Sequence, residues 1–201
     1  MTTTGTPHPS LRAARRPVVD LGPSALITSA VIALAVTFTA MTFVPDLAHH
    51  GRTGFALSGV VMTAADALYL LGVVALVCSG AVPRGPVWTA AAALALVGSA
   101  AVVVAEVLLR VSYDVGTNMF SVVGPIQSLG MVGLGIGVLR AHRWSGWRRF
   151  TWLVQGLYVP VVLVPALAAS GGQNLPALAG FHALVLTCGI AFAIELRPAD
   201  G

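Results

Sequence analysis

Six long apolar stretches, separated by short charged or turn-rich segments, constrain this chain more than any other feature of its sequence. A helix needs about 20 apolar residues to cross about 30 Å of hydrocarbon, and each stretch approaches or exceeds that length. The spans expected from the sequence are 24–44, 55–78, 88–111, 119–139, 150–169 and 176–194. The sequence therefore predicts an all-α, polytopic membrane protein built as a bundle of six transmembrane helices.

Composition excludes the other broad classes of protein. Hydrophobic residues make up 57% of the chain and charged residues only 9%, whereas a soluble domain carries about 25% charged residues. Two cysteines are too few for a disulfide scaffold, and the net charge of +4 lies in short connections rather than on a basic stripe. Intrinsic disorder, a disulfide-rich module and a nucleic-acid partner are therefore not expected.

The arginines predict the orientation of the bundle. All 11 basic residues are Arg. With the spans above, nine of them fall on one side of the membrane, and only Arg52 and Arg110 fall on the other. Cytoplasmic connections carry the excess of positive charge, so both termini are expected in the cytoplasm.

The same sequence features divide the chain into segments and suggest where the protein resides. Residues 1–20 are expected to form a mobile cytoplasmic tail, residues 21–197 the transmembrane domain, and residues 198–201 a short cytoplasmic end. An alanine-rich chain with Arg in place of Lys suggests a GC-rich bacterial genome. The expected location is therefore the cytoplasmic membrane of a bacterium.

One segment carries a family resemblance. Residues 139–149 read LRAHRWSGWRR, and apolar residues followed by the tripeptide GLY at 156–158 come next. This segment resembles the connection between the fourth and fifth spans of uncharacterised six-span integral membrane proteins of GC-rich bacteria. The resemblance implies the six-span architecture and brings no catalytic residue or cofactor with it.

Polar side chains inside four of the expected spans are the main functional signal. An ionisable group near the middle of a membrane helix costs about 2.5 to 3.5 kcal/mol, so it demands a reason. Counted from the outer ends of the spans at about 1.5 Å per residue, Glu106, His182, Gln127 and Asp66 lie about 8, 9, 12 and 16 Å deep. We therefore expect all four to line one pocket in the outer half of the bundle.

Glu106 and Arg110 are spaced i, i+4, so their side chains lie on one helical face and can form an ion pair. That pairing explains both residues without a ligand. The functional alternative is that Arg110 keeps Glu106 ionised as a proton acceptor, or that Arg110 binds an anionic head group.

Asp66 has no basic residue within one turn of its own helix. It is expected to be neutral and hydrogen-bonded to Tyr69, to Thr63 or to a neighbouring helix, because isolated charges are avoided in apolar surroundings. A neutral acid in such a place is also what a general acid requires. His182 either bonds to another helix or, oriented by Glu106, acts as a base.

Two weaker patterns concern a metal and an oligomer. Asp46, His49, His50 and Asp114 lie in the expected outer loops, but no zinc-binding spacing accompanies them, so a solvated loop is expected and neither metal nor other cofactor is assigned. Gly133 and Gly137 form a GxxxG step, which predicts a helix-packing groove and offers a face for a homo-oligomer.

Two functions of different classes fit these features. In the first, the protein binds, senses or moves a small amphiphile, a membrane lipid or a proton through the outer-half pocket, with Asp66, Tyr69, Glu106, Arg110, Gln127 and His182 as ligand-binding residues. In the second, it is an integral-membrane enzyme, an isomerase or cyclase, whose catalytic Asp66, Glu106 and His182 act by acid and base chemistry on an isoprenoid-like substrate. A pocket closed on its cytoplasmic side favours chemistry, whereas a polar path continuing past Gln155 favours transport.

Overall fold

The computed structural model describes residues 17–170 and 173–197, and in these residues it contains six helical spans long and apolar enough to cross a membrane. The expected fold class, an all-α bundle of six membrane spans, is confirmed. The elements are α1 (Pro17–Thr42), η1 (Pro45–Leu47), α2 (Thr53–Cys78), α3 (Pro86–Val111), α4 (Tyr113–Ala141), η2 (Gly146–Phe150), α5 (Thr151–Tyr158), η3 (Val159–Leu163), α6 (Val164–Ser170) and α7 (Leu175–Leu196).

Two helices begin earlier than the sequence predicts. Helix α1 starts at Pro17, seven residues before the expected start of the first span, so residues 17–20 are helical rather than part of a tail. Proline suits the first turn of a helix, and the acidic Asp20 there complements the helix dipole. Helix α4 starts at Tyr113, with its polar first turns already helical. The remaining tail positions 1–16, and the expected C-terminal segment 198–201, lie outside the described residues.

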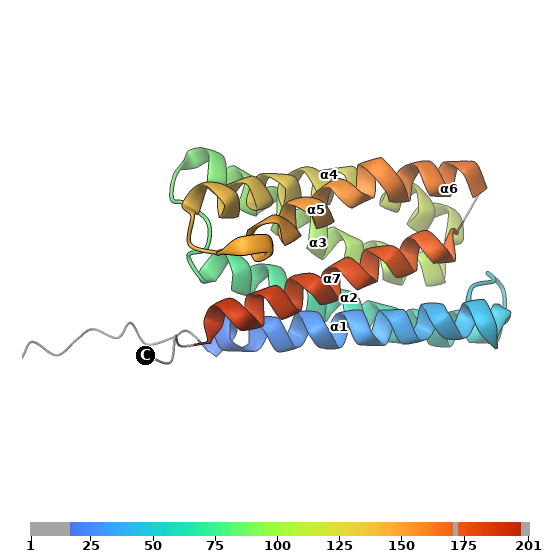
Figure 1. Ribbon diagram of the computed structural model, residues 1–201. Coiled ribbons are helices and arrows are strands. Elements are labelled where there is room, and N and C mark those ends of the chain that lie inside the picture. Colours follow the sequence, from blue (N-terminus) through green and yellow to red (C-terminus); the bar gives the residue numbers. More distant parts are fainter. Residues whose placement is uncertain (1–16, 171–172, 198–201) are drawn as a thin grey trace, which may run out of the picture.

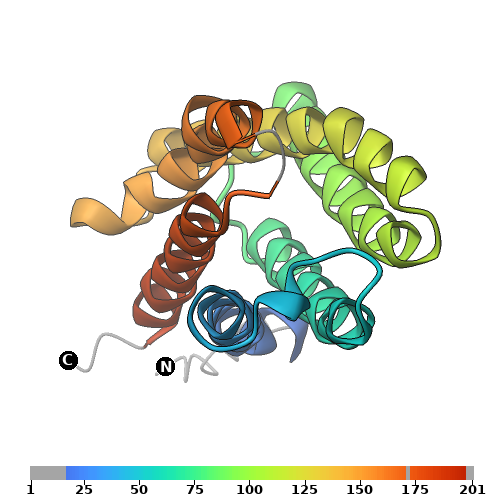
Figure 2. The same ribbon diagram turned by 90° about the vertical axis from the view of Figure 1, so that its right-hand side faces the viewer.

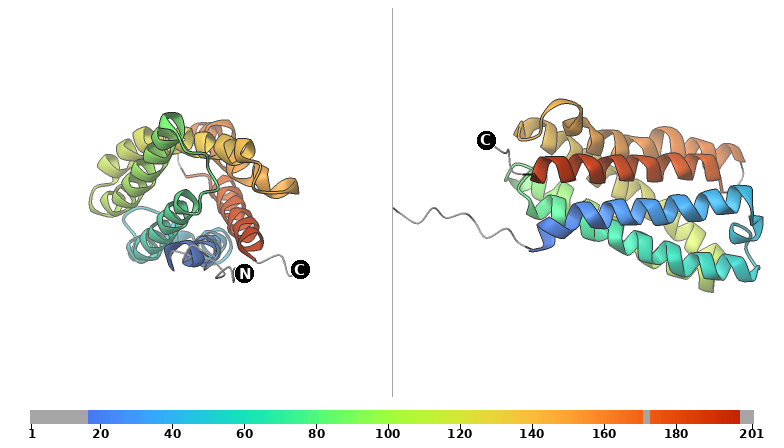
Figure 3. Two further views of the ribbon diagram at one scale, coloured as in Figure 1. Left: turned by 90° about the vertical axis from the view of Figure 1, so that its left-hand side faces the viewer. Right: turned by 60° about the horizontal axis from the view of Figure 1, so that its bottom comes forward.

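The spans form a ring in which each one packs against two neighbours (Figure 2). The order around the ring is α1, α2, α3, α4, the α5–α6 span and α7, which closes the ring against α1. Both ends of the described chain lie at the same end of the bundle, the left side of Figure 1, which Figure 3 shows face on. We call this the terminal end and the opposite one the far end.

The solid core of the ring occupies its terminal half. Trp152 of α5, Phe192 of α7 and Leu76 of α2 are all at most 1% exposed. Trp144, in the connection before α5, stacks on Phe192 with ring centroids 5.7 Å apart. Met131, Leu134 and other fully buried side chains complete this cluster. Because interiors pack at the density of organic crystals, these side chains fill most of the space between the spans in the terminal half.

Helices α3 and α4 approach closely because small residues face each other between them. A Cβ atom built at Gly130 would lie 2.2 Å from the backbone nitrogen of Ala95, and one at Gly133 would lie 2.6 Å from the Cβ of Ala91. Such contacts let two backbones pack together inside a membrane. Gly137 likewise packs against Val82, so the predicted groove is used within one chain. The homo-oligomer expected at this face stays a prediction.

The fifth span is interrupted. Helix α5 passes through the π-helical turn η3 into α6, and Pro160 lies in that turn. Proline has no N–H group, so the carbonyl of Gly156, four residues earlier, loses its helical partner. Ser128 of α4 donates a hydrogen bond to this carbonyl at 2.7 Å. In a membrane such a carbonyl must be satisfied within the protein, and this bond also ties the span to α4 where its path changes.

Candidate functional site

A cavity of about 750 Å³ occupies the far half of the ring. All six spans and the short loop around Leu47 contribute to its lining, so it lies at the centre of the ring that Figure 2 shows from the far end. Most lining side chains are apolar, among them Met62, Val102, Phe120 and Leu163. Cavities of 300 to 1,000 Å³ with mostly apolar walls and a few polar groups are typical of small-molecule sites.

The structure brings together the four polar residues that the sequence placed at similar depth. Asp66, Glu106, Gln127 and His182 all line this cavity, and so does Arg110. Tyr69, the sixth residue expected at the site, does not line it. The charged and polar groups therefore line the same cavity, although not every predicted contact between them is formed.

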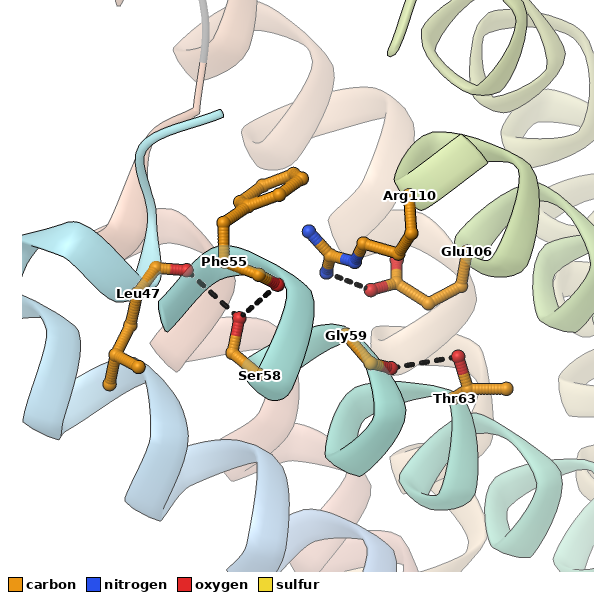
Figure 4. A network of polar contacts seen from close by, with 7 residues as sticks. All are labelled: Leu47, Phe55, Ser58, Gly59, Thr63, Glu106 and Arg110. Carbon is orange, nitrogen blue, oxygen red and sulfur yellow. Dashed lines mark hydrogen bonds and ion pairs between the residues drawn. The ribbon is translucent and has the colours of Figure 1, made fainter. Parts of the chain in front are cut away.

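The predicted ion pair between Glu106 and Arg110 is formed, as Figure 4 shows. The Nη2 group of Arg110 donates a hydrogen bond to Oε1 of Glu106, and the two side chains are only 17% and 8% exposed. The guanidinium carbon also lies 3.8 Å from the centroid of the Phe55 ring, a cation–π contact. Arg110 is thus held by a carboxylate and an aromatic face at once.

Helix α2 is shaped to accept Arg110. A Cβ atom built at Gly59 would lie 1.9 Å from the Nε atom of Arg110, so only glycine leaves room for this side chain. Ser58 donates a hydrogen bond to the carbonyl of Leu47 at 2.9 Å and so fastens the adjoining loop to α2 (Figure 4). Sequence reasoning missed Phe55 and Gly59. Their i, i+4 spacing marks one face of α2, but only the register between α2 and α3 shows that Arg110 crosses it.

Of the two acids that line the cavity, Asp66 is the one without a bonded partner among the described residues. Its carboxyl group makes no hydrogen bond or ion pair with any described residue, although it feels the charges of Glu106 and Arg110. Neither hydrogen bond expected within α2 is formed: the hydroxyl of Thr63 donates to the carbonyl of Gly59 at 2.8 Å. The structure therefore leaves the Asp66 carboxyl facing the cavity.

His182 and Gln127 differ in how they are satisfied. The Nε2 atom of Gln127 donates a hydrogen bond to the hydroxyl of Ser99 at 3.2 Å, across the α3–α4 interface. His182 is only 7% exposed, and its Nε2 atom has no partner among the described residues. Among the described residues no hydrogen bond joins His182 to Glu106, so the carboxylate-oriented imidazole, one of the two alternatives for His182, is not formed here. The two residues lie at similar depth and line the same cavity, but α3 and α7, which carry them, are not neighbours in the ring.

The cavity ends at a packed layer toward the terminal end. Tyr69 belongs to this layer, where its hydroxyl accepts a hydrogen bond from Nε2 of Gln155 at 3.0 Å. Gln155 is 1% exposed, and Met131 and Val185 are equally buried beside it. Tyr69, which the sequence predicted to be a ligand-binding residue, thus lies in the floor and not in the cavity lining. Beyond Gln155 the terminal-half core is mostly apolar, with Thr151 and Cys188 among its buried side chains.

The loop residues considered for a metal are engaged separately. Asp46 lies 3.9 Å from Nε of Arg52, and His49 bonds through Nδ1 to the carbonyl of Pro45 at 2.7 Å. His50 packs against Tyr113, with ring centroids 4.6 Å apart. Residues 17–170 and 173–197 contain no group of three or more His, Cys, Asp or Glu side chains that could hold a metal ion.

No protein family, no curated protein and no solved structure matches this chain. The site must therefore be interpreted from its own geometry. It offers a large apolar volume, a charged wall made by Asp66, Glu106 and Arg110, and a floor of packed side chains.

Proposed function

We propose that this protein binds one small amphiphile in the far-half cavity, with the apolar body of the ligand in the chamber and its polar group at the wall formed by Asp66, Glu106 and Arg110. The observation that carries the proposal is the cavity itself: about 750 Å³ of mostly apolar space that contains charged side chains. Charged residues inside membrane spans are retained where they serve a site or pair with each other. Here one pair is formed and one acid is left over.

The ligand is proposed to arrive from the extracytoplasmic side. Six of the eight described arginines lie at the terminal end, and only Arg52 and Arg110 belong to the far end. The bias of positive charge toward cytoplasmic loops supports an orientation with both termini in the cytoplasm. The protein is then a multi-pass protein of the bacterial cytoplasmic membrane whose cavity lies in the outer half.

Binding is proposed rather than transport through the bundle. The floor is built from side chains that are at most a few per cent exposed, such as Tyr69, Gln155 and Val185. Passage would require the whole terminal-half core to separate, and that core holds the six spans together. The closed floor supports a site that takes up and releases its ligand on one side.

The same floor supports a second candidate, an enzyme that uses Asp66 as an acid on a lipid-dissolved substrate. A neutral carboxyl group facing a mostly apolar chamber is suited to protonating an isoprenoid-like double bond. The two candidates differ in what leaves the cavity. A binding protein releases the compound unchanged, whereas an isomerase or cyclase releases a product of the same mass with a different chromatographic retention time.

The test is to fill the cavity. Val102 of α3 lines the cavity, whereas Val104 on the same helix is 50% exposed on the outside of the ring. We expect Val102→Trp to remove any small amphiphile that co-purifies with the protein, as seen by native and lipid-resolved mass spectrometry. Val104→Trp introduces the same side chain outside the cavity and should leave that compound bound.

The proposal fails if both variants retain the same compound in the same amount, or if the unaltered protein carries no compound and binds none when offered a panel of amphiphiles. A compound lost from both variants would also contradict it, provided that both variants unfold at the same detergent concentration as the unaltered protein.

A further inference from the structure

The charges on the cavity wall do not balance. Of the described residues that line the cavity, Asp66 and Glu106 are acids and Arg110 is the one permanent cation. The guanidinium is already committed, because it is hydrogen-bonded to Glu106 and stacked on Phe55. The pair is close to neutral as seen by a ligand, so the remaining carboxyl group decides which charge the cavity attracts.

An anionic head group fits this wall poorly. It would have to compete with Glu106 for the guanidinium, and it would lie beside the Glu106 carboxylate in mostly apolar surroundings, where like charges repel strongly. Arg110 leaves Nε and Nη1 without partners, but both atoms are buried, and Nε faces the backbone of α2 at Gly59. These donors do not offer a fork to an incoming anion.

A cation fits where an anion does not. The Asp66 carboxyl faces the cavity without a hydrogen bond, and His182 adds an unpartnered, buried Nε2 atom to the lining. Phe181, also in the lining, packs near the same part of α2, with its ring centroid 6.3 Å from that of Tyr69, one turn after Asp66. Asp66 and Phe181 both line the cavity. A cation bound there favours the ionised form of Asp66, and a carboxylate together with an aromatic ring is a combination that recognises organic cations.

We infer that the ligand of the cavity is a lipophilic organic monocation, with Asp66 as its counter-ion and the Glu106–Arg110 pair as a fixed, self-neutralised part of the wall. This inference rests on the proposed function, because it names the class of amphiphile that the same cavity takes. It places the positive group near the floor, beside Asp66, and the apolar body in the space between Val102, Phe120 and Leu163.

The test uses two probes of nearly the same shape and opposite charge, the tetraphenylphosphonium cation and the tetraphenylborate anion. Each is offered to the full chain in lipid nanodiscs of zwitterionic lipid, and protein-dependent binding is measured by equilibrium dialysis against empty nanodiscs. We expect the cation to bind one per chain. Asp66→Asn should weaken its binding at least tenfold, and Asp66→Glu should retain most of it.

Asp114 supplies the matched control, because it is an exposed acid at the start of α4 that does not line the cavity. Asp114→Asn removes the same charge and should leave the dissociation constant of the cation within about twofold, an effect of surface charge alone. Replacing part of the lipid by phosphatidylethanolamine tells whether a lipid amine or a free cation is the source of the positive group. If phosphatidylethanolamine competes with the cation, the positive group comes from a lipid head group. If it does not compete, the positive group belongs to a free cation.

The inference is overturned if the anion binds as tightly as the cation, or if Asp66→Asn, folded as shown by an unchanged unfolding transition, binds the cation normally. If the anion binds and Val102→Trp abolishes that binding, the cavity is still an amphiphile site, and only the inferred preference for a cation is wrong. If neither probe binds and no compound co-purifies, the proposed function fails together with the inference.

Discussion

The ion pair between Glu106 and Arg110 allows a quantitative test of how this wall is built. We expect Glu106→Gln to destabilise the protein, because it leaves the Arg110 guanidinium without its carboxylate partner. The Arg110 side chain is only 17% exposed and is packed against α2 at Gly59. Removing one partner of a buried ion pair costs about 3 to 5 kcal/mol, whereas an exposed pair is worth about 0 to 1 kcal/mol. The glutamine keeps an oxygen that can accept from Nη2, so the lower value, about 3 kcal/mol, is expected.

The reverse change is milder, and the double change is milder still. Arg110→Met leaves Glu106, which can take up a proton and lose its charge, so a cost of about 1 to 2 kcal/mol is expected. In the double variant both charges are gone, and buried pairs replaced by uncharged side chains are often neutral in stability. We expect the double variant to lie within about 1 kcal/mol of the unaltered protein.

The assay is reversible unfolding in mixed micelles with increasing dodecyl sulfate, followed by tryptophan fluorescence, since Trp152 is completely buried in the core. A destabilisation of about 3 kcal/mol corresponds to about two orders of magnitude in the unfolding equilibrium constant. Strictly additive effects in the double variant would refute the coupling, and so would a Glu106→Gln variant as stable as the unaltered protein. Either result means that Arg110 is satisfied by something other than Glu106.

Three further expectations follow from the same structure. Asp66→Asn should change the free energy of unfolding by less than about 1 kcal/mol in the same titration, because the carboxyl group has no bonded partner to lose. If Asp66→Asn unfolds the protein while Glu106→Gln leaves it folded, the roles assigned to the two acids are reversed. Gly130→Ala should destabilise by about 1 to 3 kcal/mol, because its Cβ would meet the backbone of Ala95 at 2.2 Å, and a thermal melt as high as that of the unaltered protein would contradict the close α3–α4 contact. In a background without native cysteines, an impermeant maleimide applied to intact cells should label a cysteine placed at His50 and spare one placed at Ser145, and the opposite labelling would invert the proposed orientation.

The architecture could be predicted from the sequence because its determinants are local. Length and hydropathy set the six spans, and i, i+4 spacing was enough for the Glu106–Arg110 pair, since both residues lie on one helix. The starts of α1 and α4 were missed for a related reason. Polar or proline-containing first turns, as at Pro17 and Asp114, resemble loop sequence although they are good helix starts.

Contacts between helices could not be predicted from the sequence. Depth alone placed Asp66, Gln127 and His182 near one level, and the cavity includes all three. Depth does not give the rotation of a helix about its axis, so Tyr69, only one turn after Asp66, was assigned to the cavity although it faces the floor. The stacking of Arg110 on Phe55 depends on the register between α2 and α3, which no spacing within either helix encodes.

The π-helical turn in the fifth span fixes the phase between the floor and the cavity. Trp152, Gln155 and Val159 face inward with ordinary helical spacing, which would bring positions near 162–163 and 166 inward next. The residues of the span that line the cavity are Leu163, Val164, Leu167 and Ala168; of these, Leu163 and Leu167 are half-buried, whereas Val164 and Ala168 are exposed. The inward side of the span therefore runs from the floor through the π-helical turn to Leu163 and Leu167 on the cavity wall. Losing one residue there would leave a segment long enough to cross the membrane, yet it would rotate a different set of side chains into the chamber.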